Sequence, residues 1–449
     1  MLRALGSLPR TGAALLRGRT TAVLPAGTAS RGAAFSTHQR ASAAAAAAAR
    51  ATACAASDAG GLAGAVPAST FASTPASKRD AGSSSSSKRP AAADFGTLSS
   101  AADVRGDGLI GRTVGGLSPI DLVKTELGSL SSSIRMLLNN DHPALDRVAK
   151  YLFQREGKGF RPMVVLLMAR ATSELTPESP REGWSLEDGV APEQRRLAEI
   201  AEIIHTGSLL HDDVVDLALT RRSAKTANVE FGNKVAVLGG DFLLAKACLY
   251  TARLRNPDVV ELVSTIIENL VEGEIMQSRT HDKDALTDFS YYMHKTYLKT
   301  ASLLANASKA AVLIAGHSEL VIEQSFLYGK HLGIAFQLVD DMLDFTGTEA
   351  AMGKKVDGAD LKAGLATAPV LFAMETYPEL RDMIARQFKE VGDVQRALRC
   401  VRETDSVERT AALAREHAQL AVDAVMHLPP SDARDALVKL ADEVLERKS

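Results

Sequence analysis

Two clusters of aspartates are the residues in this sequence whose types and spacing best fit catalytic chemistry. One is His-Asp-Asp-Val-Val-Asp at 211–216, and the other is Asp-Asp-Met-Leu-Asp at 340–344. On a helix, residues i and i+4 share a face, so the outer aspartates of each cluster point the same way. Mg²⁺ prefers carboxylate ligands, and proteins usually hold it through one or two of them together with substrate phosphate oxygens. The two clusters therefore predict a clamp that holds a diphosphate through bridging Mg²⁺ ions.

The sequence before each cluster helps to decide between a functional and a surface interpretation. A single DDxxD motif is equally compatible with an exposed acidic turn of a helix, because short motifs also occur by chance. Here each cluster directly follows an apolar run, at 203–210 and at 334–339. A fully solvated face does not need such a neighbour, so two copies with the same apolar approach favour a function.

A diphosphate site also needs cations, and two basic segments lie near the first cluster in sequence. Residues 157–162 read Gly-Lys158-Gly-Phe-Arg161-Pro, and Arg221 and Arg222 follow the first cluster closely. The first segment is not a P-loop, because it lacks the GxxxxGK[ST] pattern. Arginine suits bidentate phosphate binding and lysine supplies a point charge. Each basic segment alone is typical of a solvated surface, so its weight comes from the nearby aspartates.

Four further polar residues are candidates for phosphate binding. His205 lies on the expected helix face of Asp212, where it could donate to a phosphate near the first cluster; a lone histidine on an apolar helix is otherwise a structural residue. Lys299, Thr300 and Lys354 are weaker candidates when judged from the residues alone.

Helices are the elements that must position these residues. From about residue 117 onward, apolar residues recur at spacings of three and four, as in 163–171, 197–219 and 259–276. Alternation of period two is scarce. The pattern predicts an all-α bundle that occupies 116–449.

Breaks in the helical pattern predict the loops of this bundle. The pattern is interrupted at 173–193, a polar segment with Pro and Gly, and again at 347–364, a segment that contains Gly. The second break follows the second acidic cluster, where a substrate flap is expected. Near the C-terminus, over 407–445, Ser431 is expected to cap a last helix that serves as structural completion of the bundle.

The first part of the chain has the composition of a targeting segment. Residues 1–57 contain arginines but no Asp, Glu or Lys, as in a transit peptide. The run Arg-Gly-Ala-Ala-Phe-Ser at 31–36 resembles a mitochondrial processing signal, with a chloroplast address as the alternative. Poly-Ala and Ser-rich tracts follow, with too little apolar surface to offset the entropy of ordering. We therefore expect 1–115 to be a mitochondrial transit peptide and a disordered low-complexity segment.

Composition also excludes several classes of function. The formal net charge of −2, without a basic stripe and interleaved aromatics, argues against nucleic-acid binding. Cys54, Cys248 and Cys400 lie far apart, which suggests neither a zinc site nor a disulfide framework. No uninterrupted apolar run reaches the ~18 residues of a membrane span. We expect a soluble mature protein with at most peripheral membrane contact, in the mitochondrial matrix or associated with the inner membrane.

Taken in order, the motifs resemble those of the trans-isoprenyl (polyprenyl) diphosphate synthases, and the match covers essentially 117 to the C-terminus. The resemblance implies an isoprenoid-synthase-type helical bundle around a central deep cavity. The motifs are Gly-Lys-Gly-Phe-Arg-Pro, Ile-His-Thr-Gly-Ser-Leu-Leu-His-Asp-Asp-Val-Val-Asp, Thr-Arg-Arg, Gly-Asn-Lys-Val-Ala-Val-Leu-Gly-Gly-Asp-Phe-Leu, Gly-Glu-Ile-Met-Gln and Phe-Gln-Leu-Val-Asp-Asp-Met-Leu-Asp.

The resemblance also implies a role for each site residue. The residues that would bind isopentenyl diphosphate are Lys158, Arg161, His205 and Arg222. Those that would bind the allylic diphosphate are Arg221, Lys299, Thr300, Gln337 and Lys354. The principal Mg²⁺ ligands would be Asp212, Asp216 and Asp340, with direct or water-mediated support from Asp213, Asp341 and Asp344. The six aspartates and Lys299 would form the catalytic set.

The implied activity is a Mg²⁺-dependent, sequential condensation of isopentenyl diphosphate onto an allylic diphosphate. Gly207 and Ser208 stand where related enzymes have a large aromatic that blocks the growing chain, which implies a long all-trans product. The segment 358–373 resembles the branch that makes the ubiquinone side chain. Many relatives have a lysine where Leu365 stands, so one allylic-phosphate contact of the wider family is expected to be absent.

Other functions and assemblies stay open. The chain is alternatively a non-catalytic or partner-dependent subunit of a hetero-oligomeric synthase, although such subunits tend to lose aspartates. A shorter-chain geranylgeranyl-type synthase is disfavoured by Gly207 and Ser208, and a terpene cyclase by Lys158, Arg161 and Arg222. The resemblance implies a homodimer, with a hetero-oligomer as the alternative.

Overall fold

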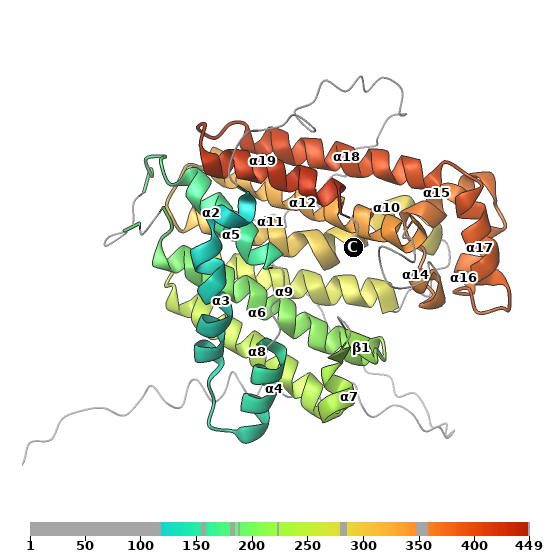
Figure 1. Cartoon of the computed structure of the whole chain (residues 1–449), viewed down its shortest axis with the longest axis horizontal. Helices are drawn as coiled ribbons and strands as arrows, with labels where there is room; N and C mark the ends of the chain where they lie inside the picture. The colour runs from blue at the N-terminus through green and yellow to red at the C-terminus, as the bar shows by residue number, and fades with distance from the viewer. Residues whose placement is uncertain are drawn as a thin grey trace, which may run out of the picture. The chain divides into compact units, whose positions relative to one another are not determined.

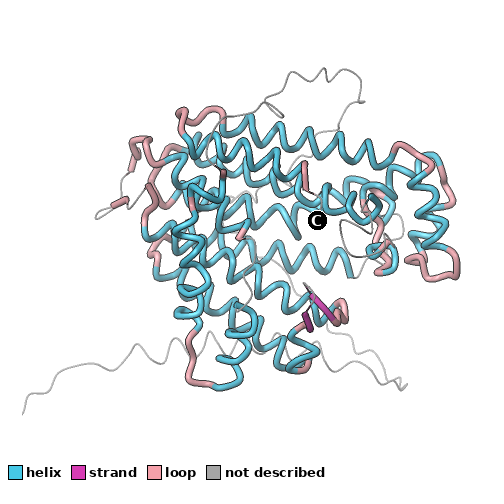
Figure 2. Tube along the Cα trace, in the orientation of Figure 1, coloured by secondary structure: helices cyan, strands magenta, loops and turns pink. Residues whose placement is uncertain are grey.

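A computed structural model of the protein describes residues 118–153, 159–179, 185–186, 189–221, 224–278, 285–346 and 358–447. Over these residues the chain is almost entirely helical (Figures 1 and 2). Its strands there are β1 (Thr220–Arg221) and β2 (Ala224–Lys225), which pair as an antiparallel ribbon. The prediction of an all-α bundle is confirmed. The leader and low-complexity expectations for 1–115 fall outside the described residues.

The helices of the first half carry the first acidic cluster and the elements around it. They are α2 (Pro119–Leu122), α3 (Lys124–Leu138), α4 (Pro143–Phe153), α5 (Phe160–Thr172), α6 (Pro192–Val215), α7 (Ala227–Phe231), α8 (Asn233–Arg253) and α9 (Pro257–Ser278).

The second half carries the second cluster and closes the bundle. Its elements are the 3₁₀ turn η1 (Ala285–Thr287), α10 (Phe289–Thr296), the π-helical η2 (Tyr297–Ala301), α11 (Ser302–Leu313), α12 (Glu319–Thr346), α14 (Ala359–Lys362), α15 (Ala368–Thr376), α16 (Leu380–Ala385), α17 (Asp393–Arg402), α18 (Ser406–Val425) and α19 (Asp432–Leu445).

Helix α12 lies at the centre of the packing, between α11 and α18, while α6 packs against α8 and α5 (Figure 1). Fully buried apolar side chains fill the space between these helices, among them Leu167, Ile203 and Leu332. Burying one such side chain contributes about 1.5–3 kcal/mol, so this shared core fixes the relative positions of the helices. The two acidic clusters, on α6 and α12, are thereby anchored to one core.

Two glycines bring α12 into close contact with α11 and η2. A Cβ atom at Gly329 would lie 2.4 Å from the carbonyl oxygen of Leu304, and one at Gly333 would lie 2.6 Å from Cα of Ala301. The two glycines are one helical turn apart and share a face. Larger residues would push the elements apart and separate the side chains of η2 from those of α12.

The structure corrects one predicted boundary and confirms another. The expected helix over 197–219 ends at Val215, so Asp216 caps the helix rather than extending it. Ser431 caps α19 as predicted, because its Oγ accepts a hydrogen bond from the Arg434 N–H at 3.2 Å. The correction matters for the site, because the chain turns sharply where the first cluster ends.

Candidate functional site

The turn that follows α6 returns the chain to the first acidic cluster. The N–H of Asp216 donates to the Asp212 carbonyl at 2.8 Å, and the N–H of Ala218 donates to the Asp213 carbonyl at 2.9 Å. Between them Leu217 adopts a left-handed backbone conformation with φ of 52°, which is unusual for a branched residue. This reversal leads directly into the β1–β2 ribbon and brings Arg221 back beside α6.

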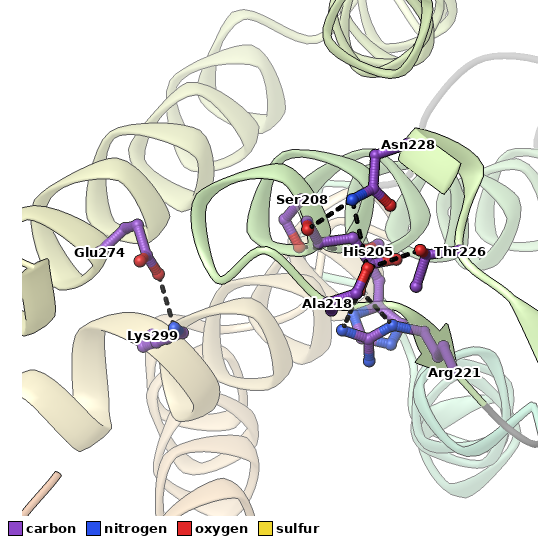
Figure 3. A network of polar contacts seen from close by, with 9 residues as sticks. His205, Ser208, Ala218, Arg221, Thr226, Asn228, Glu274 and Lys299 are labelled. Atoms are coloured by element: carbon purple, nitrogen blue, oxygen red, sulfur yellow. Dashed lines mark hydrogen bonds and ion pairs between the residues drawn. The ribbon is translucent and has the colours of Figure 1, made fainter. Parts of the chain in front are cut away.

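Arg221 pairs with the middle aspartate of the first cluster. Its Nε donates to Asp213 Oδ1 at 2.9 Å, and its Nη2 lies 2.8 Å from the same oxygen. Asn228 donates to the carbonyls of Asp213 and Ala218, and Thr226 Oγ1 donates to the Ala218 carbonyl at 2.6 Å (Figure 3). The buried Asp213 thus serves as the counter-ion that holds Arg221 at the site.

Asp212 lies near a different pair, Glu274 on α9 and Lys299 on η2. Lys299 Nζ donates to Glu274 Oε2 at 2.5 Å (Figure 3). Burial raises the pKa of Asp212 to about 6; Glu274 raises it further, and Lys299 opposes both. Burial also raises the pKa of Asp216. A partly buried carboxylate is costly to ionise, and a nearby cation reduces that cost. The surroundings of Asp212 and Asp216 therefore favour the binding of a cation.

The close contact between α9 and η2 depends on Gly273. A Cβ atom there would lie 2.9 Å from the backbone nitrogen of Lys299. Because no side chain intervenes, the backbones approach closely enough for Glu274 and Lys299 to meet. Single π-helical turns inside helices occur frequently at functional sites, and η2 is such a turn.

The element η2 also connects to the second acidic cluster. Thr300, the residue after Lys299, donates through Oγ1 to Gln337 Oε1 at 2.8 Å. Gln337 Nε2 in turn donates to Asp341 Oδ1 at 2.8 Å. Two adjacent residues of η2 therefore interact with different clusters. Lys299 interacts with the first cluster by charge, and Thr300 connects to the second through the hydrogen bonds of Gln337.

The three aspartates of the second cluster have different surroundings. Asp341 is buried and accepts a hydrogen bond from the Tyr292 hydroxyl; burial raises its pKa to about 6 against the lowering effect of that bond. Asp344 accepts from the backbone N–H groups of Ala359 and Asp360, at 2.9 and 3.0 Å, and so caps α14. Asp340 lies beside Arg447, the last residue that the structure describes.

Arg447, just after α19, reaches the second cluster. Its Nη2 lies 3.5 Å from Asp340 Oδ1, and its guanidinium lies over the Phe336 ring at 4.0 Å from the centroid. Burial raises the pKa of Asp340, and Arg447 counteracts that effect. Arg447, which follows the range 407–445 expected to complete the bundle, therefore places a cation beside the second cluster.

A cavity of about 350 Å³ lies beside the first cluster, between α3, α4, α6 and the β ribbon. We call it the α3–α6 cavity. His205, Asp213 and Arg221 line it, as does Gly159, which precedes α5 and Arg161. His205 was expected on the same helix face as Asp212. In the structure it lines this cavity together with Asp213. Lys158, Arg222 and Lys354 lie outside the described residues.

Comparison with known proteins identifies the family. The family model described as Polyprenyl synthetase matches residues 142–401, which include both acidic clusters. The chain belongs to the polyprenyl synthetase family. The resemblance inferred from the motifs is thereby confirmed.

Relatives and a solved structure define the neighbourhood within the family. A probable mitochondrial hexaprenyl pyrophosphate synthase of Neurospora crassa is 45% identical over 369 residues, covering 74% of this chain and 82% of that protein. A decaprenyl-diphosphate synthase subunit 1 of Schizosaccharomyces pombe is 44% identical over 344 residues, with 73% and 90% covered. The crystal structure of a Caulobacter crescentus polyprenyl synthase with calcium and isoprenyl diphosphate superposes with a TM-score of 0.64 at 30% identity, covering 74% of this chain and 97% of that one.

The donor set of this polyprenyl synthetase fits a divalent metal that is bound together with substrate. Among the described residues, no three His, Cys, Asp or Glu side chains form a ready-made metal cluster. Each acidic cluster instead offers carboxylates beside cations. This matches the way in which Mg²⁺ is usually held, by one or two carboxylates and by phosphate oxygens.

The small residues before the first cluster have distinct environments. Gly207 is buried against α8, where a Cβ atom would lie 3.4 Å from Cβ of Leu243, in ordinary contact. Ser208 is half-buried and donates through Oγ to the His205 carbonyl at 2.9 Å. A methyl group fits at position 207, but a large aromatic side chain there would collide with α8. The effect of Gly207 and Ser208 on the length of the product stays a prediction.

Sequence reasoning missed four residues of this site. Glu274 stands in the Gly-Glu-Ile-Met-Gln motif, so the signal was available although no role was given to it. Tyr292 and Arg447 have no motif of their own, because their contacts arise from packing. Asp360 lies beside the second cluster, inside the segment 347–364 where the flap was predicted; burial and then Asp341 raise its pKa to about 7.

Proposed function

We propose that this chain is a long-chain all-trans-polyprenyl diphosphate synthase, which adds isopentenyl diphosphate repeatedly to an allylic diphosphate. The observation that carries the proposal is the bridge formed by η2. Lys299 lies beside Asp212, and Thr300 is linked through Gln337 to the second cluster. A diphosphate held between the two clusters would meet carboxylates from both α6 and α12 and cations from η2.

Asp212, Asp216 and Asp340 are the residues proposed to hold Mg²⁺. When bound, Mg²⁺ supplies positive charge to the departing diphosphate, which favours cleavage of the allylic C–O bond. The raised pKa of Asp212 fits this role, because a cation that binds there removes the cost of ionising the buried carboxylate. The identity of the metal as Mg²⁺ rests on the chemistry of the donor set.

The protein's own side chains contribute position, charge and protection from water. Lys299, held by Glu274, is placed to contact the allylic diphosphate, and Arg221, held by Asp213, adds a second cation. The rings of Phe160 in α5 and Phe336 in α12 pack with 4.9 Å between their centroids. Apolar walls of this kind keep water from the carbocation until the isopentenyl double bond attacks it. The proton then lost from the new chain passes to the released diphosphate.

The proposed product is the precursor of the ubiquinone side chain, and the proposed location is the mitochondrion. Two observations support this assignment. The relatives from N. crassa and S. pombe carry the names of hexaprenyl and decaprenyl synthases, and the first is named mitochondrial. The small residues Gly207 and Ser208 also stand where related enzymes have a large aromatic that blocks the growing chain.

A homodimer is proposed as the functional assembly, with α8 and α9 at the interface. These adjacent helices expose apolar side chains to a degree that is unusual for a monomer surface: Leu238 is 51% exposed, Val271 58% and Ile275 50%. A hetero-oligomer is the second candidate, because the S. pombe relative is named a subunit. Sedimentation of the purified chain, alone and with a candidate partner, separates the two.

The activity is tested by incubating the purified mature chain with Mg²⁺, farnesyl or geranylgeranyl diphosphate and labelled isopentenyl diphosphate. We expect labelled products well beyond C20, sized by chromatography. Products that stop at C20 would contradict the long-chain assignment. Elongation only after a partner subunit is added would replace the self-sufficient enzyme with the partner-dependent one.

A further inference from the structure

Lys295, near the end of α10, is a half-buried cation beside the second acidic cluster. Its Nζ atom lies 5.6 Å from the centroid of the Tyr292 ring, on the side chain whose hydroxyl donates to Asp341. Among the described residues, Lys295 forms no hydrogen bond and no ion pair. Lys299 and Arg221 differ in this respect, because each is paired with a carboxylate. The ammonium group of Lys295 therefore has N–H donors available for a ligand.

Acidic groups at both clusters act on this ammonium group. Burial lowers the pKa of Lys295, and the carboxylates of Asp341 and Glu274 oppose that effect. Asp341 belongs to the second cluster, and Glu274 acts on Asp212 of the first. Lys295 is therefore within electrostatic reach of a diphosphate held between the two clusters.

Lys295 and Lys299 lie on the same side of one helical segment. Helix α10 continues directly into η2, and the two lysines are four residues apart, which places their side chains on one face. The positive charge of Lys299 also lowers the pKa of Lys295. Two ammonium groups that repel each other are both stabilised by an anion that binds between them. The pair therefore favours a ligand with several negative charges, such as a diphosphate.

A purely structural role fits Lys295 less well. Asp341, the carboxylate that acts on it most strongly, already accepts hydrogen bonds from the Tyr292 hydroxyl and from Gln337. An unpaired charge that is partly removed from water lowers the stability of a protein, and pairing it with a ligand removes that cost. Residues that serve function at a loss of stability are common in natural proteins.

We propose that Lys295 binds the diphosphate of the allylic substrate, in addition to Lys299 and Arg221. This inference rests on the proposed function, because it adds a ligand to the same diphosphate. An ammonium N–H donates to a phosphate oxygen, and the positive charge adds to the stabilisation of the diphosphate as it departs. His205, the expected ligand of isopentenyl diphosphate, lines the α3–α6 cavity, and Lys295 is not among the described residues that line it. Lys295 therefore acts on the allylic substrate rather than on isopentenyl diphosphate.

Substitutions of Lys295 separate its charge from its packing. Lys295→Met keeps an unbranched apolar stem without the charge, and Lys295→Gln replaces it if circular dichroism shows that the methionine variant is unfolded. Lys295→Arg keeps the positive charge. Lys309→Met is the matched control, because Lys309 is also half-buried and its Nζ also lies 5.6 Å from an aromatic centroid, that of Phe326. The acidic neighbour of Lys309 is Glu323, at 3.8 Å, which belongs to neither cluster.

The first experiment is a calorimetric titration of each full-length protein with inorganic diphosphate and Mg²⁺, in which no chain grows. Loss of one hydrogen bond to a charged group weakens binding by about 10- to 100-fold, so we expect a loss of about tenfold or more in Lys295→Met. Lys295→Arg should recover most of the affinity, and Lys309→Met should bind as the wild type does. The midpoint of urea denaturation should be unchanged or higher in Lys295→Met, because an unpaired charge is removed.

The second experiment is steady-state elongation with farnesyl diphosphate and isopentenyl diphosphate. In Lys295→Met the KM for farnesyl diphosphate should rise about tenfold, while the KM for isopentenyl diphosphate stays within about twofold of the wild-type value. This difference between the two KM values assigns the contact to the allylic substrate.

The outcomes separate this inference from the proposed function. Wild-type affinity for inorganic diphosphate in Lys295→Met, or an equal rise in both KM values, overturns the inference and leaves the synthase proposal standing. A lower denaturation midpoint with unchanged affinity gives Lys295 a structural role instead. The same loss in Lys309→Met, or no recovery in Lys295→Arg, also overturns the inference. A wild-type protein that neither binds inorganic diphosphate nor elongates farnesyl diphosphate would overturn the synthase proposal as well.

Discussion

Replacing Gly273 by alanine probes how closely η2 must approach α9. The new Cβ atom would lie 2.9 Å from the Lys299 backbone nitrogen and 3.1 Å from its Cβ atom, whereas ordinary contact begins at 3.4 Å. The two elements must separate by about 0.5 Å, the difference between 2.9 and 3.4 Å. Misplacing a catalytic group by 1 Å costs about 100-fold in rate, so we expect kcat to fall about tenfold.

The same substitution has opposing effects on stability. Overpacking of a close contact costs about 1–3 kcal/mol. Alanine in place of glycine within a helix returns up to about 1 kcal/mol. We therefore expect the free energy of unfolding to fall by about 0–2 kcal/mol, so the loss of activity should exceed what partial unfolding explains.

The assay is steady-state elongation with single and double variants. If Gly273 acts through the position of Lys299, Gly273→Ala should reduce kcat in the wild-type background but add little in a Lys299→Met background. Glu416→Ala, at an exposed position of α18, is the control, and we expect its kcat to be unchanged. A Gly273→Ala enzyme with wild-type kcat, or fully additive losses in the double variant, would refute the reasoning.

Three further predictions address the clusters and the packing beneath them. Asp212→Ala and Asp340→Ala should each reduce turnover about 100-fold or more at saturating Mg²⁺, and near-normal turnover in either would disprove the two-cluster clamp. His331 and His417 meet through their Nδ1 atoms at 2.9 Å, and burial lowers their pKa values to about 4 and about 3. Since unfolded histidines titrate near 6.5, the unfolded state binds more protons than the folded state below that pH. The free energy of unfolding, measured by urea denaturation, should therefore fall between pH 6.5 and 4, by about 2 kcal/mol per histidine at pH 5. This fall should be smaller in a variant in which both histidines are replaced by glutamine. Tyr292→Phe leaves a buried carboxylate oxygen without its donor and should lower the free energy of unfolding by about 1–3 kcal/mol, whereas an unchanged denaturation midpoint would show that this bond contributes nothing.

The sequence by itself determined the helical class, the two clusters and the family. These features are local or ordered along the chain. The sequence of each helix shows apolar residues with a period of about 3.6 residues. The spacing of Asp212 and Asp216, and of Asp340 and Asp344, is also given directly by their positions in the chain. The cap at Ser431 could also be predicted, because a cap depends on only a few neighbouring residues.

Only the tertiary structure decided how the cluster residues divide their roles. Asp213 faces Arg221 while Asp212 faces Glu274 and Lys299, and this difference depends on the turn at Leu217 after α6. The sequence pattern could not show that turn, because the helical period alone does not reveal where α6 ends.

The remaining contacts depend on packing between distant segments. Lys299 meets Glu274 across 25 residues because Gly273 allows the backbones to approach, and Arg447 meets Asp340 across 107 residues because α19 packs against α12. Such pairs carry no periodic signal in the sequence, since side chains far apart in the chain meet only after the core has fixed their helices. For this reason the two aspartate clusters, Arg221 and Lys299 could be named from the sequence, whereas the partners that hold these two cations, and the cation Arg447, were revealed only by the fold.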